Sequence, residues 1–256
     1  MPTLARLNVT PVKGTALQHP DGVNLTALGI PWNRRFFLVD AEGGLFSGGR
    51  HGPLVRLGAA LDEDADTLTI TFPDGAAVTG PAGAVGAAHV TDMWGRPVPG
   101  RFVEGRLGTA IGEHLGRPLR LVRANEEGDG PDVQRLTLVS LASVRELGAR
   151  SGRPDLDPGR FRINLELDGC TPFEEDGWAG RRVRIGAAVI RVLGQVPRCV
   201  VTTQDPATGL KDFDTLKRIA ELRPLMPDRG GVPFGMYAEV EEPGWAAVGD
   251  RVEPLG

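Results

Sequence analysis

The sequence contains few of the residues that mark several common protein classes. It has two cysteines, one tyrosine and 5% aromatic residues in a chain of 256. Two cysteines in a chain of this size exclude a disulfide-rich scaffold, and we expect both to be reduced thiols in a reducing compartment. The 29 Lys and Arg against 33 Asp and Glu give a net charge of −4. This balance argues against a nucleic-acid partner and against a general attraction to anionic membranes.

Long apolar runs and several catalytic motifs are also missing. No stretch approaches the roughly 18 uninterrupted apolar residues that a membrane span needs, and residues 1–6 carry no basic segment before an apolar run. We therefore expect a soluble, cytoplasmic protein. The histidines are scattered and do not have zinc-site spacing: His19, His51, His89 and His114. G-x-S-x-G, P-loop and G-x-G-x-x-G motifs are absent, so serine hydrolases, P-loop enzymes and Rossmann dehydrogenases lose their main support.

Short alternating segments bounded by turn residues dominate the sequence. The clearest is Thr67–Phe72, which precedes Pro73-Asp74-Gly75 and predicts a strand that enters a hairpin. Further strands are predicted over Ala5–Val9, Arg35–Asp40, Leu54–Ala60, Val85–Val90, Leu119–Val122, Arg162–Leu167, Ala187–Leu193 and Phe234–Glu241. The 36 glycines and 21 prolines agree with many turns. The sequence therefore predicts a mainly β protein with a few helices.

Three segments have helical periodicity. Glu104–Leu115 repeats apolar residues every four positions before Gly116, which predicts a helix that ends at a glycine. A second helix is predicted after Ser140 as its N-cap, and a third begins near Asp214 and ends before Pro224.

One charged, glycine-rich segment suggests a domain boundary. Residues 125–131 read Asn-Glu-Glu-Gly-Asp-Gly-Pro and contain no apolar side chain that would anchor a core, which predicts a surface connection. We place the two domains at residues 1–124 and 125–256. Residues 80–86 are also glycine-rich, and we expect a mobile loop there because no helix follows.

Cys199 is the residue with the strongest chemical signal. It follows Arg198, whose guanidinium stays protonated and favours the ionised form of a neighbouring thiol. The turn-like run Asp205–Gly209 begins six residues later and would lie at the rim of the same site. The alternative is a small apolar residue packed on a buried strand. Cys170, beside Gly169, is expected to pack in this way.

Several separated motifs together resemble one family. The segments that carry the resemblance are Pro11–Gly14, Gly29, Asn33–Asp40, Gly43–Arg50, Arg160–Asn164, Glu175–Trp178, Arg198–Cys199, Asp205–Gly209, Phe234–Gly235 and Val248–Val252. In their order and coverage they are similar to the MOSC proteins, named for the C-terminal domain of molybdenum cofactor sulfurase. The similarity is to the two-domain form that includes mitochondrial amidoxime-reducing components.

The resemblance implies a β-barrel N-terminal domain followed by a barrel-like MOSC domain. It also implies a molybdenum cofactor, with Cys199 as the protein ligand of the metal and the catalytic residue. A soft thiolate suits a transition metal with sulfur ligands, so the chemistry of this residue fits that role. The implied activity is reduction of N-hydroxylated compounds such as amidoximes and hydroxylamines.

The resemblance also implies which side chains hold the cofactor. The candidates are Lys13, Arg34, Arg50, Arg162, Asn164 and Arg198. Guanidinium groups bind phosphate oxygens two at a time, and an Asn amide offers both a donor and an acceptor to a pterin edge. For Glu175 and Asp176 a structural hydrogen-bonding role is favoured over catalysis.

The chain departs from the family pattern at Gly14, Asn33, Ile163 and Val196, where relatives often have serine, aspartate, proline and cysteine. It also lacks the C-x4-C-x2-C spacing of a plant-type iron–sulfur segment, so electrons would come from a separate electron-transfer protein. Two alternatives stay open. One is a carrier of the molybdenum cofactor or of a persulfide on Cys199, and the other is a specialised metabolic enzyme on the same fold.

Overall fold

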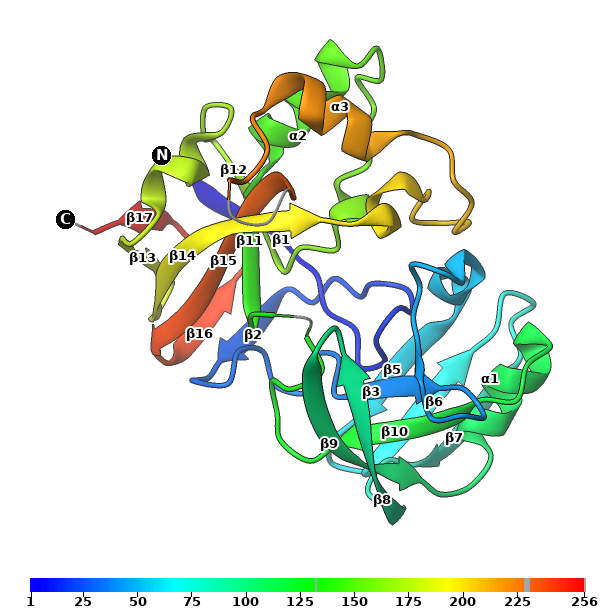
Figure 1. Ribbon diagram of the computed structural model, residues 1–256. Coiled ribbons are helices and arrows are strands. Elements are labelled where there is room, and N and C mark those ends of the chain that lie inside the picture. The colour runs from blue at the N-terminus through cyan, green and yellow to red at the C-terminus, as the bar shows by residue number, and fades with distance from the viewer. Residues whose placement is uncertain (132, 228–230, 256) are drawn as a thin grey trace.

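The computed structural model describes residues 1–131, 133–227 and 231–255. It has two β-rich halves, one above the other in Figure 1, with sheets of seven, five, three and two strands. The mainly β class predicted from the sequence is confirmed. Three α-helices lie in the described part of the chain: α1 (Leu107–Leu115), α2 (Leu141–Arg150) and α3 (Thr215–Leu222).

The upper half is built on the seven-stranded sheet. Its strands, in spatial order, are β1 (Thr3–Leu7), β12 (Leu165–Asp168), β11 (Leu136–Ser140), β15 (Val232–Glu242), β14 (Ala188–Arg198), β13 (Arg182–Ile185) and β17 (Val252–Pro254). A bridge between Thr3 and Arg251 joins the first strand to the residue before the last one, so the sheet is a nearly closed barrel. Buried aliphatic side chains fill it, Leu138, Ile190 and Met236 among them.

The lower half contains the five- and three-stranded sheets. The first has the order β4 (Leu45–Phe46), β3 (Phe36–Val39), β10 (Arg120–Ala124), β9 (Arg96–Val103) and β8 (Val85–Met93), and the second is β5 (Gly58–Asp62), β6 (Thr67–Thr71) and β7 (Ala77–Pro81). Helix α1 packs on them through Leu107 and Ile111, which join the same core as Leu68 and Ile70.

The beginning of the chain belongs spatially to the upper half. Strand β1 pairs antiparallel with β12, and β2 (Gly22–Leu25) pairs with β16 (Gly244–Ala247). The chain crosses into the lower half before β3 and is back in the upper half at β11. Between β1 and β2 the chain also contacts the lower half, because Val12 belongs to the lower core and the Ala16 N–H donates to the Leu57 carbonyl oxygen. The two halves are therefore joined by several crossings of the chain.

The helix signals in the sequence are confirmed at their ends. Ser140 caps α2, with its side chain accepting a hydrogen bond from the Ala142 backbone over 3.1 Å. Asp214 caps α3 by accepting from the Lys217 backbone over 3.3 Å. Helix α1 ends at Gly116, which has the left-handed conformation that suits glycine.

Three sequence predictions of local structure were wrong. The segment Leu54–Ala60 begins as a short helix, η1 (Gly52–Arg56), because Pro53 at its start fixes φ at a helical value, and the strand begins only at Gly58. Residues 80–86 were predicted to form a mobile loop. They instead contain the end of β7 and the start of β8.

The strand predicted to begin at Arg162 begins at Leu165. Arg162 itself has a left-handed backbone, with φ of 52°, at the end of a second short helix, η2 (Pro158–Phe161). Periodicity alone does not reveal such a residue, because the apolar alternation of the strand continues through it.

The segment at residues 125–131 is less exposed than expected. Gly130 and Pro131 are buried, and a Cβ atom on Gly130 would lie 1.6 Å from the Arg34 carbonyl oxygen. The end of the connection is therefore packed against Arg34, whereas Asn125 and Glu126 are exposed as expected.

Candidate functional site

Cys199 lies at the end of strand β14, where it becomes the N-cap of the short helix η4 (Val200–Thr203). Its thiol is free and its side chain is exposed. The backbone is extended there, with φ of −120° and ψ of 178°. Its carbonyl oxygen accepts hydrogen bonds from the Thr202 backbone N–H and hydroxyl over 3.1 and 3.0 Å. The alternative of a cysteine packed on a buried strand is therefore wrong.

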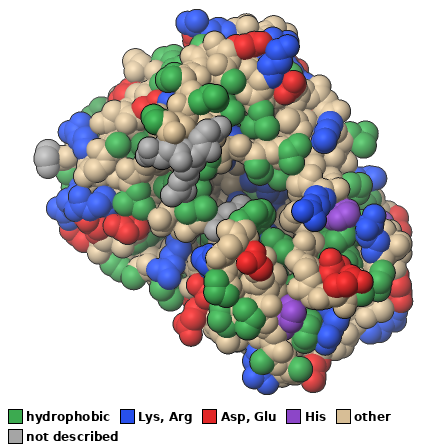
Figure 2. Space-filling view, in the orientation of Figure 1, with side chains coloured by type: hydrophobic (Ala, Val, Ile, Leu, Met, Phe, Trp, Pro, Cys, Tyr) green, Lys and Arg blue, Asp and Glu red, His purple; other side chains and the backbone are tan. Residues whose placement is uncertain are grey.

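A loop of the lower half lies against the turn that follows Cys199. The Gln204 side chain donates to the Gly48 carbonyl oxygen over 3.0 Å, and a Cβ atom on Gly49 would lie 3.4 Å from Val201. Arg50, the next residue, is exposed. Figure 2 shows a hollow between the two halves, with Lys or Arg side chains inside it. The two halves thus meet beside the cysteine.

The Arg198 guanidinium lies beneath the surface behind Cys199. It donates to the carbonyl oxygens of Phe234 and Phe161 over 2.6 and 3.1 Å. Its third nitrogen, Nη2, is buried and has no hydrogen-bond partner among the described residues. Burial lowers the pKa of Arg198 to about 10, and the nearby positive charge of Arg34 acts in the same direction.

Arg34 and Arg162 join the two halves from opposite sides. Both have left-handed backbones, with φ of 55° and 52°. The Arg34 guanidinium donates to the Arg162 carbonyl oxygen over 2.9 Å, and the Arg162 guanidinium donates to the Thr15 carbonyl oxygen over 2.6 Å. Left-handed non-glycine residues are uncommon and tend to cluster at functional sites.

Lys13 is buried at the same junction, with 8% of its surface exposed. Its ammonium group donates to the Gly130 carbonyl oxygen over 2.9 Å and lies 5.3 Å from the centre of the Trp94 ring. Trp94 is 63% exposed at the turn between β8 and β9, again with a left-handed backbone. Trp94 was not among the site residues predicted from the sequence. Its turn setting before Gly95 was the available signal.

Asn164 is buried, and both ends of its amide have protein partners. Its nitrogen donates to the Asn8 carbonyl oxygen over 3.1 Å, and its oxygen accepts from the Thr137 hydroxyl over 3.0 Å. These contacts hold the region before β12 against the segment that follows β1. A contact between Asn164 and a pterin edge stays a prediction.

Glu175 and Asp176 have structural partners, as expected. Glu175 is fully buried and accepts hydrogen bonds from the Ser140 backbone and the Ser143 hydroxyl. Burial raises the pKa of Glu175. Asp176 forms an ion pair with Arg223. Both carboxylates therefore anchor the short helix η3 (Glu174–Trp178) to its surroundings.

The second cysteine and the turn after η4 also match expectation. Cys170 is partly buried against the upper core, and desolvation raises its pKa to about 11. The Asp205 carboxylate accepts from the backbone N–H groups of Ala207 and Thr208, which closes the predicted turn. Hydrogen bonds hold the pKa of Asp205 below its usual value, although partial burial opposes them.

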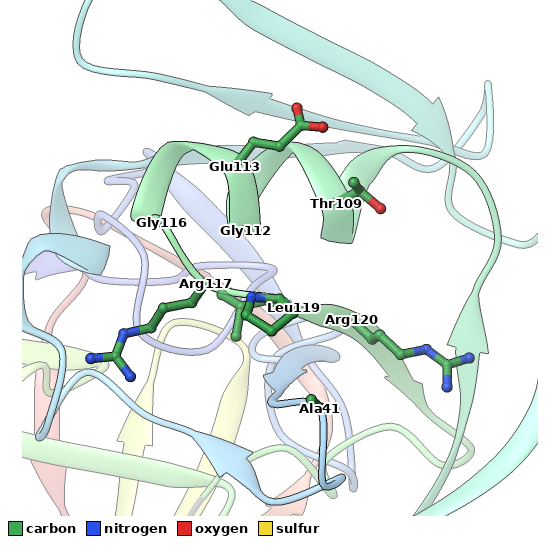
Figure 3. Close-up of a pocket in the computed structure, with 9 residues that line it drawn as sticks. Ala41, Thr109, Gly112, Glu113, Gly116, Arg117, Leu119 and Arg120 are labelled. Atoms are coloured by element: carbon green, nitrogen blue, oxygen red, sulfur yellow. The ribbon is translucent and has the colours of Figure 1, made fainter.

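A separate hollow of about 630 Å³ lies on the lower half, between the end of α1 and the start of β10. Figure 3 shows Glu113, Arg117 and Arg120 around it. None of the site residues predicted from the sequence lines it. It offers no thiol to a metal, so we do not assign it the chemistry of Cys199.

The residues beside Cys199 fit an anionic group that includes a soft metal. Arg34 and Arg198 donate only to carbonyl oxygens and form no ion pair with a carboxylate within the described ranges, so their positive charges are uncompensated there. A phosphate or similar anion would compensate them. The exposed Cys199 sulfur is a ligand type that molybdenum accepts. No group of three or more His, Cys, Asp or Glu that could hold a metal lies in the described part of the chain.

Family models match both halves of the chain. The MOSC domain matches residues 125–253, and the MOSC N-terminal beta barrel domain matches residues 1–102. This chain belongs to the MOSC family. The family resemblance deduced from the sequence motifs is thereby confirmed.

Named relatives of this MOSC protein cover most of its length. It is 28% identical to mitochondrial amidoxime reducing component 2 of Bos taurus over 98% of this chain and 82% of the relative. It is 26% identical to mitochondrial amidoxime-reducing component 1 of Homo sapiens, over 99% and 83% respectively. Molybdenum cofactor sulfurase of Oryza sativa subsp. japonica is 26% identical over 90% of this chain but only 33% of its own length. Within the described residues, no helix has both the length and the apolarity to cross a membrane.

Proposed function

We propose that this MOSC protein is a molybdenum cofactor-binding oxidoreductase that reduces N-hydroxylated compounds such as amidoximes and hydroxylamines. The observation that carries the proposal is the exposed Cys199 thiol beside two guanidinium groups, of Arg34 and Arg198, whose charges lack carboxylate partners. The names of its relatives, amidoxime-reducing components and molybdenum cofactor sulfurases, support the same chemistry.

In this proposal Cys199 is the metal ligand. Its extended backbone at the end of β14 presents the sulfur at the surface, while the bonds from Thr202 fix the peptide behind it. Bound molybdenum cofactor would supply two-electron oxygen-atom transfer at the metal. The thiol must lose its proton to ligate, and the positive charge of Arg198 favours that loss.

The basic residues around the hollow hold the anionic part of the cofactor. Arg34, Arg162 and Arg198 come from elements of both halves, and Lys13 and Arg50 flank them on the lower half. Guanidinium groups already fixed on carbonyl oxygens lose little conformational entropy when an anion binds. Asn164 is buried next to this surface and is held by its hydrogen bonds to Asn8 and Thr137.

The overall reaction consumes two electrons and two protons and converts an N–OH group to N–H and water. The chain carries no iron–sulfur cysteine motif. We therefore assign the electrons to a separate electron-transfer protein. The exposed position of Cys199 leaves the reacting centre within reach of such a partner and of solvent protons.

The test uses the full chain produced in cells that make molybdenum cofactor. Molybdenum per polypeptide is measured by elemental analysis in the wild type, in Cys199→Ser and in the control Cys170→Ser. We expect molybdenum in the wild type and in the control but not in Cys199→Ser. Reduction of benzamidoxime with an artificial electron donor should follow the same order.

Two outcomes would contradict the proposal. Stoichiometric molybdenum without reduction of any N-hydroxylated compound would remove the catalytic part. A persulfide on Cys199 in metal-free protein, detected by mass spectrometry, would support a sulfur carrier instead.

A further inference from the structure

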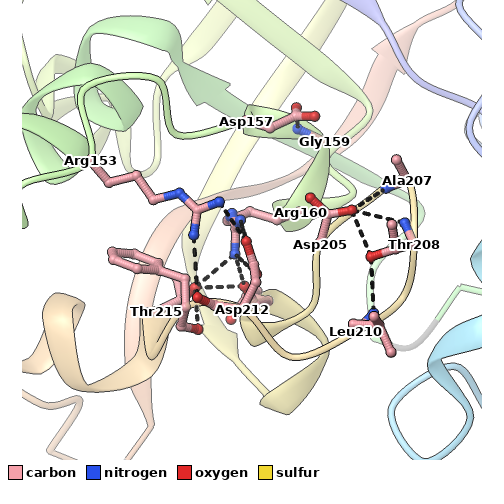
Figure 4. A network of polar contacts seen from close by, with 12 residues as sticks. Arg153, Asp157, Gly159, Arg160, Asp205, Ala207, Thr208, Leu210, Asp212 and Thr215 are labelled. Atoms are coloured by element: carbon pink, nitrogen blue, oxygen red, sulfur yellow. Dashed lines mark hydrogen bonds and ion pairs between the residues drawn. The ribbon is translucent and has the colours of Figure 1, made fainter.

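A buried cluster of polar side chains stands directly behind the turn that begins at Cys199. Figure 4 shows Arg160, Asp212 and Thr215 converging in this cluster. Arg160 belongs to η2 and is 2% exposed. Its guanidinium lies 3.3 Å from the Asp212 carboxylate, which also forms an ion pair with Arg153 over 2.6 Å. A charge at this depth is costly to bury unless it is paired and hydrogen-bonded, and Asp212, Thr202 and Thr215 supply those partners.

The cluster converges on one carbonyl oxygen of η4. The Thr202 carbonyl accepts from the Thr215 hydroxyl over 2.6 Å and from the Arg160 guanidinium over 3.0 Å. Thr202 in turn donates twice to the Cys199 carbonyl, through its backbone N–H and its hydroxyl. An unbroken path of hydrogen bonds therefore runs from the buried Arg160 to the peptide of Cys199.

This path fixes the turn from its buried side. On the outer side, the cysteine and Val200 are exposed. A four-residue 3₁₀ turn has little intrinsic stability, so its geometry depends on tertiary partners of this kind. We propose that Arg160, together with Asp212 and Thr215, positions the Cys199 sulfur by clamping the Thr202 carbonyl. The catalytic importance of that sulfur rests on the proposed function. The hydrogen bonds of the clamp do not, because they are present in the metal-free chain.

Substitutions at Thr215 and Arg160 distinguish a local effect on the Cys199 turn from a general loss of stability. Thr215→Val removes the hydroxyl at constant shape, and Thr215→Ser restores it. Arg160→Lys keeps the charge but loses the planar pair of donors. Arg153→Gln is the matched control, because Arg153 binds the same Asp212 carboxylate but not the Thr202 carbonyl.

The first measurement is amide hydrogen exchange in metal-free protein, read at the Thr202 and Gln204 N–H groups. Loss of one buried hydrogen bond predicts exchange about tenfold faster at these amides in Thr215→Val and Arg160→Lys. Thr215→Ser and Arg153→Gln should resemble the wild type. Core amides of β15 should not change in any variant.

The second measurement is steady-state reduction by molybdenum-loaded protein. Because Arg160 and Thr215 act through Cys199 and not on substrate, kcat should fall by about 100-fold in Thr215→Val while KM stays the same. Unchanged exchange at Thr202 and Gln204 would overturn the clamp. Faster exchange throughout the seven-stranded sheet would also overturn it, because it would show a merely structural role. If the wild type binds no molybdenum, the proposed function fails, and exchange alone decides the clamp.

Discussion

The Arg34 guanidinium donates to the Arg162 carbonyl oxygen over 2.9 Å, across 128 residues of sequence. Arg162 returns the link by donating to Thr15, so each arginine reaches into the other half. Both backbones are left-handed, a conformation that costs an L-residue about 1 kcal/mol. The hydrogen bonds that these two arginines make between the halves hold their backbones in this conformation, beside the positively charged Arg198.

Replacement of Arg34 tests whether this charge holds the cofactor. Arg34→Gln keeps a non-glycine residue at the left-handed position, so the backbone cost is unchanged, but the charged donor is lost. We expect molybdenum retained after dialysis to fall about tenfold, as for loss of a charged hydrogen bond. Arg34→Lys should recover part of it, and Arg56→Gln, at an exposed residue of η1, should have no effect. Retention of molybdenum by Arg34→Gln at the wild-type level would contradict the role.

The contact between Gly52 and Gly209 tests how closely the halves must approach. A Cβ atom on Gly52 would lie 1.9 Å from the Gly209 carbonyl oxygen. Gly52→Ala should therefore lower the free energy of unfolding by about 1–3 kcal/mol through overpacking. The control Gly177→Ala, where no atom lies within 4 Å of the added methyl, should change it by less than about 0.5 kcal/mol. Urea unfolding measures both, and equal effects would argue against a tight contact.

Glu175 should give the stability of the protein a specific pH dependence. Burial raises its pKa in the folded state above the ordinary 4.5, and the nearby Asp176 charge adds to this. The folded state then binds this proton more tightly than the unfolded state, so the stabilising contribution is greatest below pH 4.5 and is lost as the pH rises through the folded pKa.

Glu175→Gln removes this titration. The stability of the wild type relative to the variant should therefore decline from pH 4.5 upward, measured as the difference between their urea unfolding free energies at each pH. Taking the difference removes the carboxylates whose pKa values are lowered, such as Asp168 and Glu241. A difference independent of pH would show that the Glu175 proton is not coupled to folding.

The two cysteines should react at very different rates. Burial raises the pKa of Cys170 to about 11, so at pH 8 roughly one in a thousand of these thiols is ionised. Cys199 is exposed. Iodoacetamide at pH 8 should therefore modify Cys199 well before Cys170 in metal-free protein, as followed by peptide mass spectrometry. Equal rates would mean that Cys170 is accessible in a way that its packing does not allow.

Much of the local structure was predictable because it depends on neighbouring residues. The hairpin at Thr67–Thr71 follows from alternation before a Pro-Asp-Gly turn, and the caps of α2 and α3 follow from Ser140 and Asp214. The error at Leu54 has a local cause too, since Pro53 starts a short helix within a strand-like pattern.

The supporting structure of the site was not predictable in this way. Arg160 was part of a family motif, but nothing near it in sequence indicates that it reaches Thr202, 42 residues away. The burial of Gly130 arises from contact with Arg34, which the composition of residues 125–131 does not reveal. Such contacts depend on how separate elements pack.

The sequence by itself determined the β-rich class and the family, and it singled out Cys199 as the candidate metal ligand, because each of these inferences depends on residue types at fixed local spacings. Only the tertiary structure decided that Cys199 is exposed, that Asn164 has protein partners at both ends of its amide, and that Arg34 and Arg162 cross between the halves. The physical reason is that burial and hydrogen-bond partners are properties of the packed chain. A linear pattern specifies which groups exist, while folding specifies which of them meet.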